Sequence, residues 1–195
     1  MSFYPKKISE KFHAPDNVGK ADNANAKGTG ASFTCGAVLR FTLQIESETK
    51  EIRQAKFQTN GCGYLIAAAD VLANETTGKN LRDFHGADKS VLETVIKNEI
   101  GEFSANREHC LELCLETLQN AFADFRLFQI EEFAGEKALV CTCFGVSEDT
   151  IENVIAANSL ETVEEVTDAC SAGGGCGSCQ FLIQEILDVR QMENR

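Results

Sequence analysis

Two cysteine pairs in the last third of the chain have the residue types and spacing of metal ligands. The first is the C-x-C pair Cys141 and Cys143, and the second is the C-x-x-C pair Cys176 and Cys179. Four soft thiolates suit a zinc ion or an iron–sulfur cluster. Glycines around the second pair let the backbone approach a charged centre closely. The pattern therefore predicts a metal site, and its spacing alone leaves zinc and [2Fe–2S] open.

A second set of thiols is spread over the first part of the chain. Cys35 stands at the start of a predicted strand, and Cys62 lies between two glycines at a strand-to-helix junction. Cys110 follows His109 near the start of a long predicted helix. The N–H groups of a helix N-terminus favour a thiolate at Cys62. Because the gaps between these residues are long, spacing alone leaves a shared site and separate structural roles equally open.

Length, charge and cysteine content limit the classes of protein to consider. A chain of 195 residues suits one domain or two small ones, and no window approaches the roughly 18 apolar residues of a membrane span. The N-terminus lacks the apolar segment of a secretory signal, so nine cysteines indicate a reducing cytoplasm. Residues 138–195 hold 2 Lys and Arg against 10 Asp and Glu, which argues against nucleic-acid binding. This acidity suits docking to a basic protein surface, or simply solubility.

The first part of the chain reads as an α+β domain over residues 1–132. Alternating apolar and polar residues predict strands at 39–45 and 52–59, which form a hairpin. Residues 20–30 are rich in Asn, Ala and Gly, which predicts an irregular loop. The helices predicted from apolar spacing cover residues 4–12, 64–77, 88–98 and 106–128. Helices packed against an antiparallel sheet are therefore expected.

The rest of the chain reads as a linker at 133–137 and a small all-α domain over 138–195. Ser147 can cap one helix, and Thr162 with Glu165 forms a capping box for another. A final helix follows the last cysteine pair, so both pairs lie in loops. A domain of under about 60 residues is marginal alone, and a bound metal centre would add stability.

Short motifs accompany the cysteines of both parts. They are Pro15-Asp16-Asn17-Val18-Gly19, Cys35-Gly36, Gly61-Cys62-Gly63 and His109-Cys110, and then Cys141-x-Cys143-Phe144-Gly145-Val146 and Cys176-x-x-Cys179. The first four motifs resemble the iron–sulfur scaffold family of IscU and the first domain of NifU. The last two resemble the central [2Fe–2S] domain of NifU, which is related to bacterioferritin-associated ferredoxin. The resemblance covers almost the whole chain, and no counterpart of the third NifU domain follows.

The resemblance implies a scaffold for assembly and transfer of iron–sulfur clusters, which is not an enzyme. Cys35, Cys62 and Cys110, with His109, would receive sulfur and iron and hold a transient [2Fe–2S] or [4Fe–4S] cluster, or zinc. The four cysteines of the second domain would hold a permanent [2Fe–2S] cluster, which we hypothesise supplies electrons for reducing persulfide sulfur or for cluster release. The implied partners are a cysteine desulfurase, apo iron–sulfur acceptors, a reductase as a further candidate, and a second copy in a homodimer.

The chain departs from the scaffold pattern at two places. The family has Asp two residues after its first cysteine, where this chain has Ala37. The chaperone motif Leu-Pro-Pro-Val-Lys is replaced by residues 103–107, which argues against handover to that chaperone. Without the Asp, the first cluster is expected to be held longer, with His109 or Cys114 as a fourth ligand. Cys114 lies on the same helix face as Cys110, although a small core residue is the favoured reading.

Two other classes of function stay open from the sequence. One is a stable cluster-carrying electron-transfer or redox-sensing protein, motivated by Ala37, and the other is a zinc-binding interaction module. Cys170 lies outside both pairs and is expected to be a buried, inert thiol. His13 and His85 are expected to be ordinary surface or hydrogen-bonded histidines.

Overall fold

The computed structural model describes residues 3–86, 88–133 and 139–193, and these form two compact units. Two loops from the first part of the chain fold with the C-terminal part. Of the predicted linker, residues 134–137 lie outside the described residues, and the predicted domain boundary stays a prediction. Unit 1 is Met1–Ile45, Ile52–Lys79 and Ala87–Phe125, and unit 2 is Glu46–Glu51, Asn80–Gly86 and Arg126–Arg195.

Unit 1 contains an antiparallel sheet of three strands in the order β1 (Ala26–Ala31), β2 (Val38–Ile45) and β3 (Ile52–Thr59). The predicted hairpin is confirmed as β2 and β3, with Phe41 opposite Phe57. Alternate side chains of β2 are fully buried, as a strand with one face toward the core requires. The sheet thus places Cys35 before β2 and Cys62 after β3.

The loop predicted at 20–30 is wrong for its second half, where β1 pairs with β2. Apolar alternation does not reveal this strand, because two of its inward positions are Gly28 and Gly30. A Cβ on Gly28 would lie 2.0 Å from the carbonyl oxygen of Thr117, and one on Gly30 would lie 2.3 Å from the Thr117 Oγ1. The glycines therefore let helix α4 pack directly on the strand.

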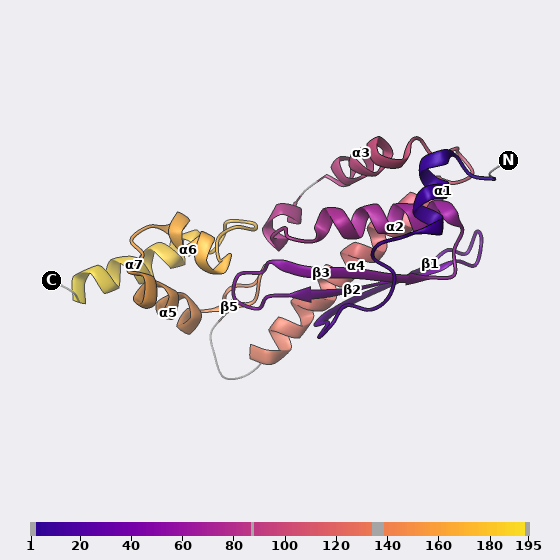
Figure 1. Cartoon of the computed structure of the whole chain (residues 1–195). Helices are drawn as coiled ribbons and strands as arrows, with labels where there is room; N and C mark the ends of the chain where they lie inside the picture. The colour runs from indigo at the N-terminus through magenta and orange to yellow at the C-terminus, as the bar shows by residue number, and fades with distance from the viewer. Residues whose placement is uncertain (1–2, 87, 134–138, 194–195) are drawn as a thin grey trace. The chain divides into compact units, whose positions relative to one another are not determined.

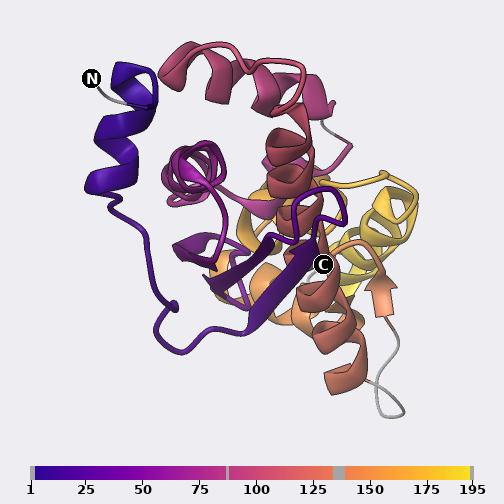
Figure 2. The same ribbon diagram turned by 90° about the vertical axis from the view of Figure 1, so that its right-hand side faces the viewer.

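Four α-helices accompany the sheet, and the first lies alongside α2 in both views (Figures 1 and 2). The buried carboxylate of Asp70 on α2 fixes the N-terminal segment. It accepts hydrogen bonds from Lys11 Nζ at 2.7 Å and from the Asn17 backbone N–H at 2.9 Å. The Pro15-to-Gly19 motif therefore has a structural role. The helices are α1 (Lys6–His13), α2 (Gly63–Thr76), α3 (Lys89–Ile100) and α4 (Glu108–Phe133), whose residues from Arg126 on belong to unit 2.

Unit 2 is mainly helical, but it is not all-α as predicted. Strands β4 (Leu139–Cys141) and β5 (Val146–Ser147) form a short antiparallel hairpin, because the C-x-C turn brings the backbone back on itself. The predicted caps are confirmed: Ser147 Oγ accepts from the Thr150 N–H, and Thr162 forms a capping box with Glu165. The helices of this unit are α5 (Glu148–Asn158), α6 (Val163–Cys170) and α7 (Gln180–Glu193), with the 3-10 helix η1 (Leu81–Phe84).

The two early loops of unit 2 are tied to its later residues by polar contacts. Lys50 is buried, and its ammonium donates to Gln129 Oε1 at 2.7 Å and to the Ser47 carbonyl. The Ser171 hydroxyl donates to the Thr49 carbonyl oxygen at 3.3 Å. Burying an ammonium is costly unless it is hydrogen-bonded, so these bonds hold the Glu46–Glu51 loop in place. Within the described ranges, no helix has both the length and the apolarity for a membrane crossing.

Candidate metal centres

The first centre is formed where α2 and α4 begin. Cys62 is the N-cap residue of α2, and Cys110 lies in the first turn of α4. Their sulfur atoms are 3.8 Å apart. That separation equals the roughly 3.8 Å edge of a tetrahedron with metal–thiolate bonds of about 2.3 Å. His109 Nε2 lies 3.5 Å from the Cys110 sulfur, so the His109-Cys110 pair and Cys62, 48 residues earlier, lie next to each other here.

The surroundings hold Cys62 as a thiolate. A hydrogen bond from the Cys110 thiol is the largest cause that lowers the pKa of Cys62, to about 5. Burial opposes this shift, while the backbone N–H groups of Leu65 and Tyr64 and the charge of Arg107 add to it. Sharing its proton with Cys62 raises the pKa of Cys110, and burial acts in the same direction. The pair is one nucleophilic thiolate beside one protonated thiol.

Cys35 and Cys114 differ sharply in their surroundings. Cys35 is exposed in the loop before β2, and its charge contributes to raising the pKa of Cys110. Cys114 is fully buried, with its thiol 3.8 Å from the Leu65 carbonyl oxygen, and burial raises its pKa strongly. Cys35 is thus an exposed thiol on the loop before β2, whereas Cys114 has the surroundings of a core residue.

Arg107, the last residue of the segment that replaces the chaperone motif, also contributes to this centre. Its Nη1 atom lies 3.8 Å from the Cys62 sulfur, and its guanidinium carbon lies 5.8 Å from the ring centre of Tyr64. Tyr64 also packs against Tyr4 and Phe103, with ring centres 5.7 and 5.6 Å away. An aromatic group therefore holds the cation beside the thiolate.

Ala37 lies on the loop that carries Cys35. Its side chain is 6% exposed, and its carbonyl accepts a hydrogen bond from the Ser32 N–H at 2.8 Å. A methyl group at this position offers no oxygen donor to a metal. The residue that replaces the Asp of the scaffold family is therefore nearly buried, and it lies on the loop that carries Cys35.

The second centre is built from the four paired cysteines of unit 2. Cys141 ends β4, Cys143 lies in the following turn, and Cys176 and Cys179 lie in the loop before α7. The sulfurs of Cys143 and Cys176 are 3.4 Å apart. The thiol of Cys179 interacts with that of Cys141. The folded chain thus forms two thiol pairs, each with one member from each motif.

The pairs contain thiols of different acidity. The Ser178 hydroxyl, 3.0 Å from the sulfur, is the largest cause that lowers the pKa of Cys176, to about 7. Burial is the largest cause that raises the pKa of Cys179 to about 11, and the neighbouring Cys141 adds to it. Burial likewise raises the pKa of Cys143. Thiols held protonated by burial and by each other release their protons when a metal binds them.

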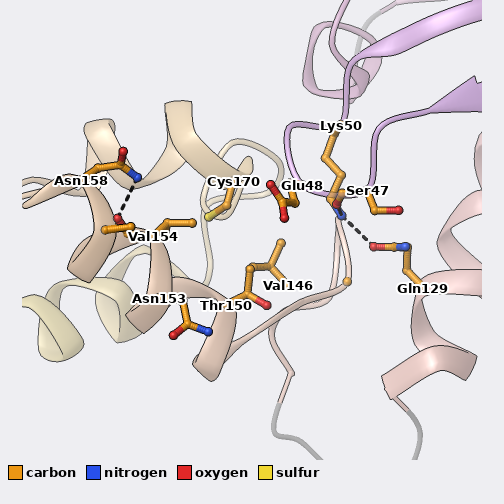
Figure 3. A pocket seen from close by; sticks show the side chains of 12 residues that line it. Ser47, Glu48, Lys50, Gln129, Val146, Thr150, Asn153, Val154, Asn158 and Cys170 are labelled. Carbon is orange, nitrogen blue, oxygen red and sulfur yellow. Dashed lines mark hydrogen bonds between the residues drawn. The ribbon is translucent and has the colours of Figure 1, made fainter.

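Cys170 belongs to neither of the paired cysteine motifs. It is buried, donates to the Val166 carbonyl at 3.2 Å, and has its pKa raised first by burial. It lines a pocket of about 450 Å³ together with residues such as Lys50 and Thr150, as Figure 3 shows. These surroundings agree with the inert thiol predicted from the sequence.

The donor sets fit iron–sulfur chemistry. In the described part of the chain, no three Cys, His, Asp or Glu side chains already converge as one metal ion would need. A [2Fe–2S] cluster asks instead for two pairs of thiolates, one pair on each iron. The two thiol pairs of unit 2 match that requirement in number and chemistry.

Comparison with known families gives one match around each of the two centres. The family described as "NifU-like N terminal domain" matches residues 3–132, and the one described as "BFD-like [2Fe-2S] binding domain" matches residues 139–189. The first match spans most of the chain and includes every donor of the first centre; the second includes all four paired cysteines. The chain therefore belongs to the NifU-like N-terminal domain family, with a BFD-like [2Fe–2S] domain match after it, and the predicted resemblance is confirmed.

Individual relatives cover both regions. The nitrogen fixation protein NifU of Azotobacter chroococcum is 35% identical over 184 residues, which is 94% of this chain and 58% of that protein. The iron–sulfur cluster assembly scaffold protein IscU of Aquifex aeolicus is 33% identical over 131 residues, covering 66% of this chain and 80% of that protein. The chain thus spans about three fifths of the length of the NifU proteins that it matches.

A solved structure supports the fold of the first region. The N-terminal part of a NifU-like protein from Brucella abortus matches with a TM-score of 0.50 at 16% identity. The match covers 67% of this chain and 96% of that structure. At this identity the likeness concerns the fold alone, and it agrees with the α+β domain expected from the sequence.

Proposed function

We propose that unit 1 is a scaffold on which an iron–sulfur cluster is built and from which it is transferred to acceptor proteins. Iron and sulfide are its cargo, and Cys35, Cys62 and Cys110 with His109 are its donors. The observation that carries this proposal is the Cys62 thiolate, with a pKa of about 5, at 3.8 Å from the Cys110 sulfur. A thiolate next to a protonated thiol is both a nucleophile for sulfur and a ligand for iron.

Sulfur is proposed to arrive as a persulfide on a cysteine desulfurase. The Cys62 thiolate attacks the outer sulfur of that persulfide, so an S–S bond forms at Cys62 while the donor's S–S bond breaks. The donor leaves as a thiolate, and no net oxidation or reduction occurs. Arg107, 3.8 Å from the Cys62 sulfur, offsets the negative charge that the new persulfide keeps. The chain acts here as an acceptor and not as an enzyme.

Unit 2 is proposed to hold a permanent [2Fe–2S] cluster on Cys141, Cys143, Cys176 and Cys179. When bound, such a cluster supplies one-electron transfer. The residues around it bury two of the thiols and leave Cys176 exposed. A homodimer, a reductase partner and a cytoplasmic location stay predictions.

Cluster transfer tests the proposal. The chain is loaded anaerobically with iron and sulfide, incubated with an apo-ferredoxin, and separated from it. We expect one cluster to move and one to stay, so that about half of the iron remains on the chain. Retention of both clusters would contradict the scaffold and support a stable electron carrier. That second candidate is favoured by the apolar, 6% exposed side chain of Ala37.

The change Ala37→Asp separates the two candidates further. A carboxylate two residues after Cys35 adds an exchangeable oxygen donor, so the transfer rate to apo-ferredoxin is expected to rise about tenfold, the size of effect typical of groups next to metal ligands. The matched control is Thr34→Asp, which adds the same charge at an exposed position on the other side of Cys35. Equal rates in the parent, the variant and the control would show that Ala37 does not govern release.

A further inference from the structure

The loop that contains η1 contacts the glycine loop before the last cysteine pair. Arg82 Nη1 lies 2.8 Å from an Asp168 carboxylate oxygen. A Cβ on Gly174 would lie 3.5 Å from the Arg82 Cδ. Both loops belong to unit 2, although Arg82 lies in the region matched by the NifU-like N-terminal family. An early segment of the chain thus forms one wall of the second centre.

His85 follows η1, and its imidazole lies next to the glycine loop that carries the second cysteine pair. Its Nε2 atom lies 3.2 Å from the position that a Cβ on Gly175 would occupy, and the Cys143 sulfur lies 3.0 Å from the same position. The imidazole also packs on Phe144, with ring centres 5.8 Å apart. A Cβ at position 175 would lie 2.9 Å from the Cys143 Cβ and 3.0 Å from its sulfur, so glycine is required there if Cys143 is to keep its position.

We propose that His85 donates a hydrogen bond from Nε2 to the sulfur of Cys143 when that sulfur is a cluster ligand, and thereby raises the reduction potential of the cluster held in unit 2. The proposal rests on the [2Fe–2S] cluster assigned above to the four paired cysteines. Reduction adds negative charge to the cluster and its thiolates, and a donor aimed at a ligand sulfur stabilises that charge. His85 is a positioning and tuning residue and not a ligand. The sequence does not predict this role, because His85 belongs to no motif and is expected to be an ordinary surface or hydrogen-bonded histidine.

The change His85→Phe tests the hydrogen bond without removing the ring. Phenylalanine keeps the packing on Phe144 but has no N–H. The reduction equilibrium is expected to move about tenfold toward the oxidised form, which is about 59 mV for a one-electron couple. The measurement is a redox titration followed by visible absorption, in full-length chains that also carry Cys62→Ser so that the second centre dominates the signal.

Two further variants sharpen the result. His85→Gln keeps an N–H donor and is expected to shift the equilibrium less than His85→Phe does. The matched control is His13→Phe, the same substitution on α1 in unit 1, which is expected to leave the potential unchanged.

Iron and acid-labile sulfide are quantified first, so that failure of the proposed function can be told apart from failure of the inference about His85. A parent chain that binds no cluster at the paired cysteines overturns the proposed function, and this inference with it. A loaded parent whose potential equals that of His85→Phe overturns the inference alone. A lower unfolding temperature with an unchanged potential would assign His85 to packing only.

Discussion

Replacing Cys141 by serine is expected to remove about two iron ions and two sulfides per chain after anaerobic reconstitution. Cys141 is 1% exposed at the end of β4 and its thiol interacts with that of Cys179, so the substitution removes a buried ligand. A [2Fe–2S] cluster that loses one of four thiolates loses a ligand from one iron, and a serine hydroxyl is a poor replacement for a soft thiolate ligand. The measurement is iron and acid-labile sulfide per chain, with the visible spectrum recorded in parallel.

Cys170→Ala is the matched control for this loss. Cys170 is also buried in unit 2, and burial raises its pKa, yet its thiol is bonded to the Val166 carbonyl. The control is expected to keep the full iron and sulfide content of the parent. If Cys141→Ser also keeps it, the paired cysteines do not hold the cluster. If every reconstituted preparation is colourless and contains only zinc, iron–sulfur chemistry is excluded for the chain.

The parts of the fold that the sequence predicts are those with local signals. The strand over residues 39–45 alternates apolar and polar side chains, and Ser147 and Thr162 are recognisable caps. The strand β1 has no such signal, because Gly28 and Gly30 take the inward positions. Glycine is required at both positions because α4 packs directly on this strand. The contacting residue, Thr117, lies about ninety residues further along the chain, so the sequence near β1 does not reveal the contact.

The two centres, like the fold, are predictable from the sequence only where the signal is local. Cysteine spacing and flanking glycines identify the thiols, since those features are local and chemically specific. Which thiols pair, and at what pKa, depends on contacts such as that of Arg107 with Cys62. His85 shows the limit most clearly: a single histidine without a motif carries no signal, and its place beside Cys143 follows from how two distant loops pack in unit 2.

The two centres also differ in the chemistry that their surroundings allow. Cys62 is half-buried with its charge stabilised before any metal arrives, which suits a group that must react with incoming sulfur. Cys141 and Cys179 are buried and close to each other, which suits a ligand set that keeps what it binds. Reactivity in unit 1 and retention in unit 2 are therefore consistent with transfer from one centre and storage at the other.

Alkylation of the metal-free chain by iodoacetamide is expected to modify Cys62 at pH 6 about tenfold faster than an ordinary exposed cysteine. With a pKa of about 5, roughly nine tenths of Cys62 is thiolate at pH 6, against well under a hundredth for a thiol of pKa about 8.5. The weaker nucleophilicity of a low-pKa thiolate removes much of this several-hundred-fold advantage but not all of it. The rate should fall as the pH drops through about 5, where the thiolate becomes protonated. Mass spectrometry of the labelled chain between pH 4 and 8 gives the rate for each cysteine.

Two cysteine variants test the cause of this reactivity. Cys110→Ala removes the thiol whose hydrogen bond is the largest cause of the low pKa, so the inflection of the Cys62 profile should move upward toward the range of an ordinary cysteine. Cys114→Ala removes an equally buried thiol that donates to the Leu65 carbonyl instead, and the profile should stay in place. A parent inflection above pH 8 would show that Cys62 is an ordinary thiol, and the scaffold proposal would lose the nucleophile on which it depends.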